Sequence, residues 1–209
     1  MIDMDNNVQL IGFYGGDTTH ACSAWTSTSR DLNDEKRERI PELLKMLADN
    51  NHGTPFEKSM IHFLVTCDTA SHIHLLKSRI AVSINTESAR YKELKDDKFY
   101  IPEDWPDDLQ RRLKEWATDL YAMYHDTFTT LVNRGYSKAR AKESARFLLP
   151  YANQLTMDVS FNFRSFMLFQ KLRNDEHAQL EIRTIAKKML KLVKETGAFD
   201  ASLKAFGYE

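Results

Sequence analysis

One long stretch with helical periodicity, residues 107–134, constrains the fold of this chain more than any other feature. Apolar residues recur in it every three or four positions, which is the pattern of an amphipathic helix with one buried face. They are Leu109, Leu113, Trp116, Leu120, Tyr124, Phe128 and Leu131, and Gly135 is expected to end the helix. That face needs a core to cover it, and 42% of the 209 residues are hydrophobic, which is enough for one.

Strand-like segments are few, and long helical segments separate them. Residues 8–14, 60–67 and 156–163 are predicted to form strands, the last continuing into a helix near Asn162. Residues 34–50 and 175–196 have helical periodicity, whereas residues 80–92 are expected to be irregular because their hydroxyls and amides compete for backbone hydrogen bonds. We therefore predict an α+β (mixed α/β) fold in a single domain over residues 1–209, without a G-x-G-x-x-G motif or a P-loop.

The charge and the cysteines restrict the partners and the compartment. The formal net charge is -1, so the chain as a whole lacks the electrostatic footprint of a protein that binds nucleic acid or an anionic membrane. No apolar run approaches the ~20 residues that cross a bilayer, and the acidic N-terminus differs from a secretory signal. Cys22 and Cys67 are 45 positions apart and have no metal-ligand spacing. We expect a cytoplasmic protein without a metal, in which any anion is bound by a local cluster of cations.

Four blocks of polar residues stand out against this background. They are Lys77-Ser78-Arg79 followed after eight residues by Ser88-Ala89-Arg90-Tyr91, then His52-x-Thr54-Pro55-Phe56-Glu57, Ala145-Arg146-x-x-Leu149-Pro150, and Asn162-x-Arg164-Ser165 with Leu172-Arg173-x-x-x-His177-Ala178-Gln179. Taken singly, Arg146 is explained by an arginine whose stem packs and whose head stays in water, and His52 and His177 are typical of structural or solvated histidines. Arg164 and Arg173 lie in an aromatic-rich stretch, where an unpaired charge is costly and a carboxylate or phosphate is the usual companion.

In order and spacing, the four blocks resemble those of the flavin-dependent thymidylate synthases over nearly the whole chain. The resemblance implies a small, mostly antiparallel sheet with long amphipathic helices, and a homotetramer that binds FAD at subunit interfaces. It also implies reductive methylation of dUMP to dTMP, in which 5,10-methylenetetrahydrofolate supplies the carbon, reduced FAD supplies the hydride and NADPH reduces the flavin. The partners are then small molecules, with neither nucleic acid nor membrane among them.

The resemblance also assigns roles to individual residues. Ser88 and Arg90 are expected to hold the dUMP phosphate, Arg146 lies on the nucleotide, and His74 falls where the family has a nucleotide-contacting glutamine. Thr86, Glu87 and Ala89 belong to the same substrate loop, and Glu87 also falls within the flavin site. Arg173 matches the catalytic residue that contacts the uracil ring and favours ionisation of its N3. The remaining flavin-binding residues are expected to be His52, Thr54, Lys77, Ser78, Arg79, Asn162 and Arg164.

The sequence departs from the family pattern at four points. Lys77-Ser78-Arg79 stands where Arg-His-Arg is typical, one extra residue precedes Ser88, His74 replaces glutamine, and Leu168 stands where a flavin-contacting asparagine can occur. These differences leave two further interpretations open. The first is an enzyme of the same fold with an altered C5 modification or with UMP as its substrate. The second is a non-catalytic homologue that binds a flavin or a nucleotide.

Overall fold

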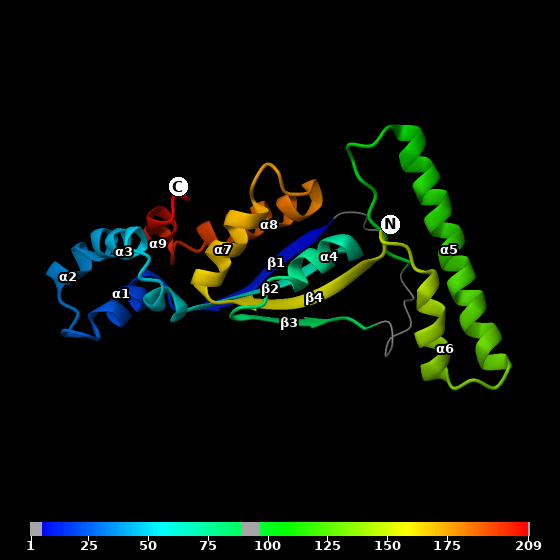
Figure 1. The fold of residues 1–209 in the computed structure, drawn as a ribbon, viewed down its shortest axis with the longest axis horizontal. Helices are drawn as coiled ribbons and strands as arrows, with labels where there is room; N and C mark the ends of the chain where they lie inside the picture. Colours follow the sequence, from blue (N-terminus) through cyan, green and yellow to red (C-terminus); the bar gives the residue numbers. More distant parts are fainter. Residues whose placement is uncertain (1–5, 89–96, 209) are drawn as a thin grey trace. The chain divides into compact units, whose positions relative to one another are not determined.

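The computed structural model describes residues 6–88 and 97–208, and all structural statements below concern these residues. The four strands are β1 (Asn7–Tyr14), β2 (Met60–Asp68), β3 (Val82–Thr86) and β4 (Gln154–Phe161). The α-helices are α1 (Asp17–Trp25), α2 (Asp34–Glu38), α3 (Ile40–Asp49), α4 (Thr69–Leu76), α5 (Asp107–Asn133), α6 (Lys138–Ala145), α7 (Phe163–Arg173), α8 (Leu180–Lys194) and α9 (Asp200–Ala205). Two short 3-10 helices, η1 (Thr54–Glu57) and η2 (Arg146–Leu148), complete the described elements (Figure 1).

The strands form one antiparallel sheet in the order β1-β2-β4-β3, and the predicted α+β class is confirmed. Backbone bonds at the two ends of the β3–β4 pair show its antiparallel register, because Glu87 N donates to Thr156 O at 2.9 Å and Asn162 N donates to Ala81 O at 3.3 Å. The prediction that residues 80–92 are irregular is wrong for the part that forms β3. Pairing with β4, which is remote in sequence, overrides the weak strand propensity of the serine and the asparagine there.

The chain divides into two compact units, which we describe separately. One unit contains residues 6–7, 66–74, 85–88 and 97–157, and the other contains residues 8–65, 75–84 and 158–208. All four strands contribute residues to both units. The prediction of a single domain over residues 1–209 therefore stays a prediction.

In the first unit, the long helix predicted over residues 107–134 is present as α5, and α6 packs against it (Figure 1). Tyr121 and Tyr124 are the large buried side chains of its inner face. Tyr121 joins a cluster with Phe99, Ile101 and Ala117, to which the segment before β4 contributes two partly buried apolar residues. Ser137 caps α6 by accepting a hydrogen bond from Arg140 N at 3.2 Å, which explains where that helix begins.

In the second unit, α7 covers one face of its part of the sheet, and α8 packs against α7 (Figure 1). Phe63 on β2 and Phe161 on β4 contact Phe166 of α7, and Phe161 also contacts Phe169. All four rings are buried, and burial of rings of this size supplies most of the apolar area of such a core. The helix α7 is thus held on the sheet along its length.

Two predicted helices differ from those observed in the second unit. The stretch 34–50 forms two helices, α2 and α3, which meet at Arg39. Pro41 follows this junction, and a proline has no N–H to donate to the preceding turn. The helix predicted over residues 175–196 begins later, at Leu180. Within the described residues, no helix combines the length and the apolar character that crossing a membrane requires.

Candidate functional site

The first unit contains a cavity of about 440 Å³ beside the end of β3. It brings together four residues predicted to bind the substrate, namely Thr86, Glu87, Ser88 and Arg146. Its other lining residues are Thr69, His72, Leu149, Pro150, Tyr151, Asn153 and Leu155. The predicted residues Ala89 and Arg90 lie outside the described residues. We call this cavity the nucleotide pocket, after the ligand that the resemblance in the sequence predicts for these residues.

Two structural features position the predicted substrate residues in this pocket. Glu87 N donates to Thr156 O at 2.9 Å, so the pairing with β4 continues one residue beyond β3 and fixes the start of the Thr86–Ser88 segment. Arg146 follows α6 at the start of η2, and its side chain is exposed, so the guanidinium remains available to a ligand. An arginine fork beside hydroxyl and backbone donors is the arrangement that binds phosphate groups in proteins.

His72 lines this pocket, whereas the histidine predicted to contact the nucleotide is His74. Its Nε2 is 3.2 Å from Thr86 Oγ1, and burial lowers the pKa of His72 below its ordinary value. The two histidines are two positions apart on α4, which rotates one against the other by roughly 200° around the helix axis. His74 does not line the nucleotide pocket, and its Nδ1 is buried without a hydrogen-bond partner among the described residues. The repeat of 3.6 residues per turn is the feature of the sequence that places His72 and His74 on different sides of α4.

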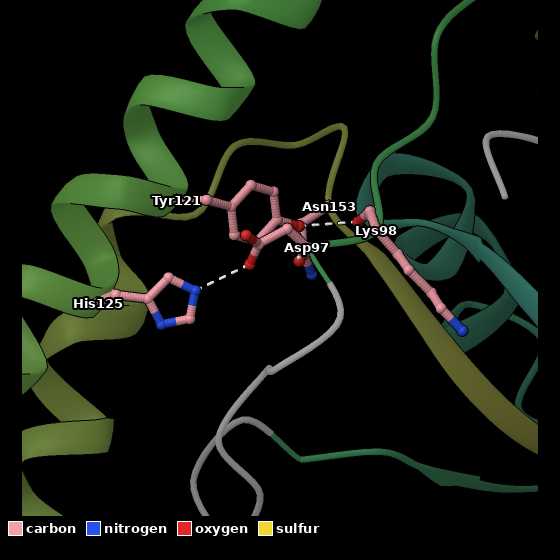
Figure 2. Close-up of polar contacts among 5 residues, drawn as sticks. All are labelled: Asp97, Lys98, Tyr121, His125 and Asn153. Carbon is pink, nitrogen blue, oxygen red and sulfur yellow. Dashed lines mark hydrogen bonds and ion pairs between the residues drawn. The ribbon is translucent and has the colours of Figure 1, made fainter. Parts of the chain in front are cut away.

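A polar network connects α5 to Asn153, which lines the pocket (Figure 2). The hydroxyl of Tyr121, on α5, lies 2.6 Å from Asn153 Oδ1 and 2.8 Å from the carbonyl oxygen of Lys98. One turn further along α5, His125 Nε2 is 2.9 Å from Asp97 Oδ1. Burial, together with the nearby Asp97 carboxylate and Tyr124, raises the pKa of Tyr121, so the phenol stays protonated as a donor. The sequence analysis missed this network because its members come from separate segments.

The second unit contains a larger cavity, of about 780 Å³, at the start of α7. Asn162 and Arg164, both predicted to bind the flavin, line it together with Ser165, Ile80 and Ala81. The other lining residues are Ala48, Asp49, Asn51, Glu57, Met167, Leu168, Lys171, Ala205, Phe206 and Tyr208. We call this cavity the α7 pocket.

Hydrogen bonds at the start of α7 fix the turn that follows the Lys77-Ser78-Arg79 motif. Asn162 caps α7 by accepting from Ser165 N at 2.8 Å, and Ser165 Oγ donates to the carbonyl oxygen of Ile80 at 2.7 Å. The backbone of Ala81, which has φ of 50°, accepts from Asn162 N. In the motif that precedes this turn, Lys77 and Arg79 are exposed and Ser78 is half-buried. The turn is therefore tied to the same helix end as two other predicted flavin residues.

Arg164 is held by a carboxylate and by a glycine. Its Nη1 lies 2.6 Å from Glu57 Oε1 of η1, and its guanidinium packs over Gly53. A Cβ at Gly53 would lie 2.6 Å from Arg164 Nε, which is closer than such atoms approach. His52, Gly53 and Arg164 line a further cavity of about 100 Å³, whereas Thr54 is exposed at the beginning of η1. His52 and Arg164 thus meet, and Thr54 lines neither this cavity nor the α7 pocket.

Arg173 is the last residue of α7 and is partly buried. Its Nε is buried and has no hydrogen-bond partner among the described residues. Arg173 does not line the α7 pocket of its own unit. An orphaned guanidinium nitrogen at a buried position is costly, so it points to an interaction that the isolated chain does not supply.

Comparisons with known proteins place this chain in a family. The model of the thymidylate synthase complementing proteins (Thy1) matches residues 9–196. The chain belongs to the Thy1 family. The flavin-dependent thymidylate synthase of Pseudothermotoga lettingae is 33% identical over 187 residues, which cover 86% of this chain and 80% of the relative. That of Thermosipho melanesiensis is 31% identical over 215 residues, which cover 96% and 91%.

Solved structures also resemble this Thy1 chain over its whole length. The UMP/dUMP methylase PolB from Streptomyces cacaoi, bound with 5-Br dUMP, superimposes with a TM-score of 0.82 at 25% sequence identity. The match covers 98% of this chain and 96% of PolB. The same enzyme bound with 5-Br UMP gives a TM-score of 0.81, also at 25% identity, with coverage of 99% and 97%.

The residues of the Thy1 chain fit the flavin that the family implies. The α7 pocket combines Arg164, Lys171 and the hydroxyl of Ser165 with the apolar side chains of Ile80 and Leu168. FAD has an anionic pyrophosphate and a flat aromatic ring, so it needs cationic donors and apolar surface together. Gly53 leaves room for the Arg164 side chain to pack against the backbone, which a Cβ would prevent. In the described part of the chain, no group of three or more His, Cys, Asp and Glu side chains could hold a metal ion.

Proposed function

We propose that this chain is a flavin-dependent methylase that converts dUMP to dTMP. Membership of the Thy1 family supports a flavin-dependent nucleotide methylation. The observation that carries the proposal is the nucleotide pocket, in which Thr86, Glu87, Ser88 and Arg146 meet although Arg146 is 58 residues beyond Ser88 in the sequence. The pocket volume suits a mononucleotide better than a polymer, because ligand sites of this kind span ~300–1,000 Å³.

The residues predicted to bind the substrate divide the nucleotide between them. Arg146 and the Ser88 hydroxyl bind the 5′-phosphate, since a guanidinium and a hydroxyl supply charged and neutral donors to its oxygens. Arg90 joins them by the resemblance to the family. By the resemblance to the family, Arg173 supplies a fixed positive charge beside the uracil, where negative charge develops as C5 becomes nucleophilic.

The α7 pocket and the preceding turn hold the flavin in this proposal. Arg164, Asn162 and Ser165 bind its polar part, and Lys77 and Arg79 contribute exposed cations from the adjoining turn. When FAD is bound and reduced by NADPH, it supplies the hydride that completes the methyl group, and 5,10-methylenetetrahydrofolate supplies the carbon. The FAD site at subunit interfaces, the homotetramer and the cytoplasmic location stay predictions.

A second candidate substrate is UMP. It is favoured by the likeness to PolB, a UMP/dUMP methylase solved with 5-Br dUMP and with 5-Br UMP. The difference between the two substrates is a single 2′-hydroxyl. A site that hydrogen-bonds this hydroxyl rejects a ligand that lacks it by several orders of magnitude, whereas a neutral site discriminates weakly.

The test is the mass of the nucleotide product. Purified protein with FAD, NADPH and 5,10-methylenetetrahydrofolate is incubated separately with dUMP and with UMP. We expect dUMP to gain one methyl group. If only UMP gains a methyl group, the substrate is UMP and not dUMP. Absence of a methylated product from both nucleotides, with FAD bound, refutes the proposal.

Two arginine variants test the roles. Arg173→Ala is expected to lower the turnover number with a smaller change in the dissociation constant of dUMP, because its charge acts on the ring. Arg146→Ala is expected to raise that dissociation constant by roughly tenfold or more, because a charge-assisted contact to the phosphate is lost. Titration calorimetry with dUMP and single-turnover kinetics separate the two effects, and their reversal contradicts the assigned roles.

A further inference from the structure

His72 is a titratable residue of the nucleotide pocket to which neither the family resemblance nor the proposed chemistry gives a role. It lies on α4 and lines the pocket together with Thr86, Glu87 and Arg146. The charged or titratable residues that line the pocket with it are Glu87 beyond β3, Arg146 of η2 and Tyr151 before β4. His72 is half-buried, so a ligand in the pocket can reach its ring.

The hydrogen bond to Thr86 determines what His72 offers a ligand. If Thr86 donates its hydroxyl proton to Nε2, the proton of the neutral ring is on Nδ1. If Nε2 donates to Thr86 instead, the hydroxyl proton of Thr86 points elsewhere. In both cases the neutral pair has one proton left for an acceptor. When the ring is protonated, two protons are available to an acceptor, one on Nδ1 and one on the Thr86 hydroxyl, and the ring carries a positive charge. The protonated pair therefore matches a phosphate group better than the neutral pair does.

We propose that His72 is a nucleotide-binding residue that takes up a proton when a 5′-mononucleotide enters the pocket beside Arg146. This inference rests on the proposed function, because it takes the ligand of this pocket to be a nucleotide. In the free protein, burial lowers the pKa of His72, which favours the neutral ring near pH 7. A phosphate dianion and the Glu87 carboxylate favour the protonated ring, and Arg146 opposes them. Binding thus shifts the balance toward the charged form.

The decisive measurement is the number of protons taken up when dUMP binds. Calorimetric titrations at pH 7.5 in buffers with different heats of ionisation give this number directly. At this pH the free nucleotide phosphate is already mostly a dianion, since its second pKa is about 6. We expect the wild-type protein to take up a substantial fraction of one proton, and His72→Gln to take up close to none. The affinity of the wild-type protein should also fall by up to about tenfold per pH unit above neutrality, and that of His72→Gln should vary less.

His62→Gln is the matched control. His62 is also half-buried and its Nε2 lies 2.6 Å from Asp158 Oδ1, but it belongs to the other unit and lines neither pocket. This variant should keep the wild-type proton uptake. His72→Asn serves as a second substitution if His72→Gln does not fold, as judged by circular dichroism.

The outcomes separate this inference from the proposed function. Binding of dUMP by the wild-type protein without proton uptake overturns the role of His72, and so does equal uptake by the wild-type protein and a folded His72 variant. Failure of the wild-type protein to bind both dUMP and UMP overturns the proposed function itself. Loss of proton uptake in the His72 variants alone supports the inference.

Discussion

His20, on α1, is a fully buried histidine whose protonation should destabilise the second unit. Its ring contacts Phe56, Phe163 and Phe199. Nδ1 lies 2.9 Å from Ser202 Oγ, and Nε2 lies 2.8 Å from Ser59 Oγ. Ser202 donates its only hydroxyl proton to Asp17 Oδ1 at 2.5 Å, so it accepts from His20. The proton of the neutral ring is therefore on Nδ1, and Ser59 donates to Nε2.

The size of this destabilisation follows from the pKa of His20. Burial lowers the pKa of His20 from 6.5 to about 4. Between these values the unfolded chain binds more protons than the folded one, so the free energy of unfolding falls as the pH falls below 6.5. From pH 7 to pH 5 the loss from this group is about 2 kcal/mol, and it approaches about 3 kcal/mol near pH 4. A loss of this size is a large share of the stability of a typical domain.

Urea unfolding at pH 7, 6 and 5 measures this loss, with His20→Gln as the perturbation. The variant should be less stable than the wild-type protein at pH 7, because a buried ring and its hydrogen bonds are lost. The difference should shrink by about 2 kcal/mol at pH 5, because glutamine does not titrate. His177→Gln is the control, since the His177 side chain is 90% exposed, and it should keep the wild-type pH dependence. Parallel pH profiles for the wild-type protein and His20→Gln refute the reasoning.

Two further substitutions test the supports of the two pockets. Tyr121→Phe should lower the free energy of unfolding by about 1–3 kcal/mol, because Asn153 Oδ1 and the Lys98 carbonyl lose a buried donor; an unchanged urea midpoint contradicts the importance of this network. Gly53→Ala should weaken flavin retention, measured by absorbance near 450 nm after gel filtration, because the new Cβ displaces Arg164. Retention of flavin equal to that of the wild-type protein would show that Arg164 does not depend on this close approach.

The elements that the sequence predicts well are those whose pattern is local. The periodic apolar face of α5 and the strand-to-helix change at Asn162 are both present. β3 was missed because its evidence is non-local. Ser83 and Asn85 are exposed and Val82 and Ile84 are half-buried, so the alternation is weak, and the strand is stabilised by its pairing with β4.

The same distinction applies to the site. The resemblance to the family predicted that Ser88 and Arg146 bind the same nucleotide, and both line the nucleotide pocket. The role of Asn153 was not predictable, because it depends on a hydroxyl that α5 places beside it from 32 positions away. His72 lines the pocket although it was not predicted to, and the helical repeat places it on a different side of α4 from His74, whose role stays a prediction.

The hydrogen bonds at the start of α7 give a physical reason why two blocks of the family pattern occur together. The turn after Lys77-Ser78-Arg79 needs two donors for its backbone carbonyls, because Ala81 adopts a positive φ that a side chain tolerates poorly. Ser165 and Asn162 of the later block supply these contacts at Ile80 and Ala81. The position of the exposed cations in the earlier block thus depends on polar residues about 80 positions away. The replacement of histidine by Ser78 leaves this attachment intact, because none of these bonds involves the side chain of residue 78.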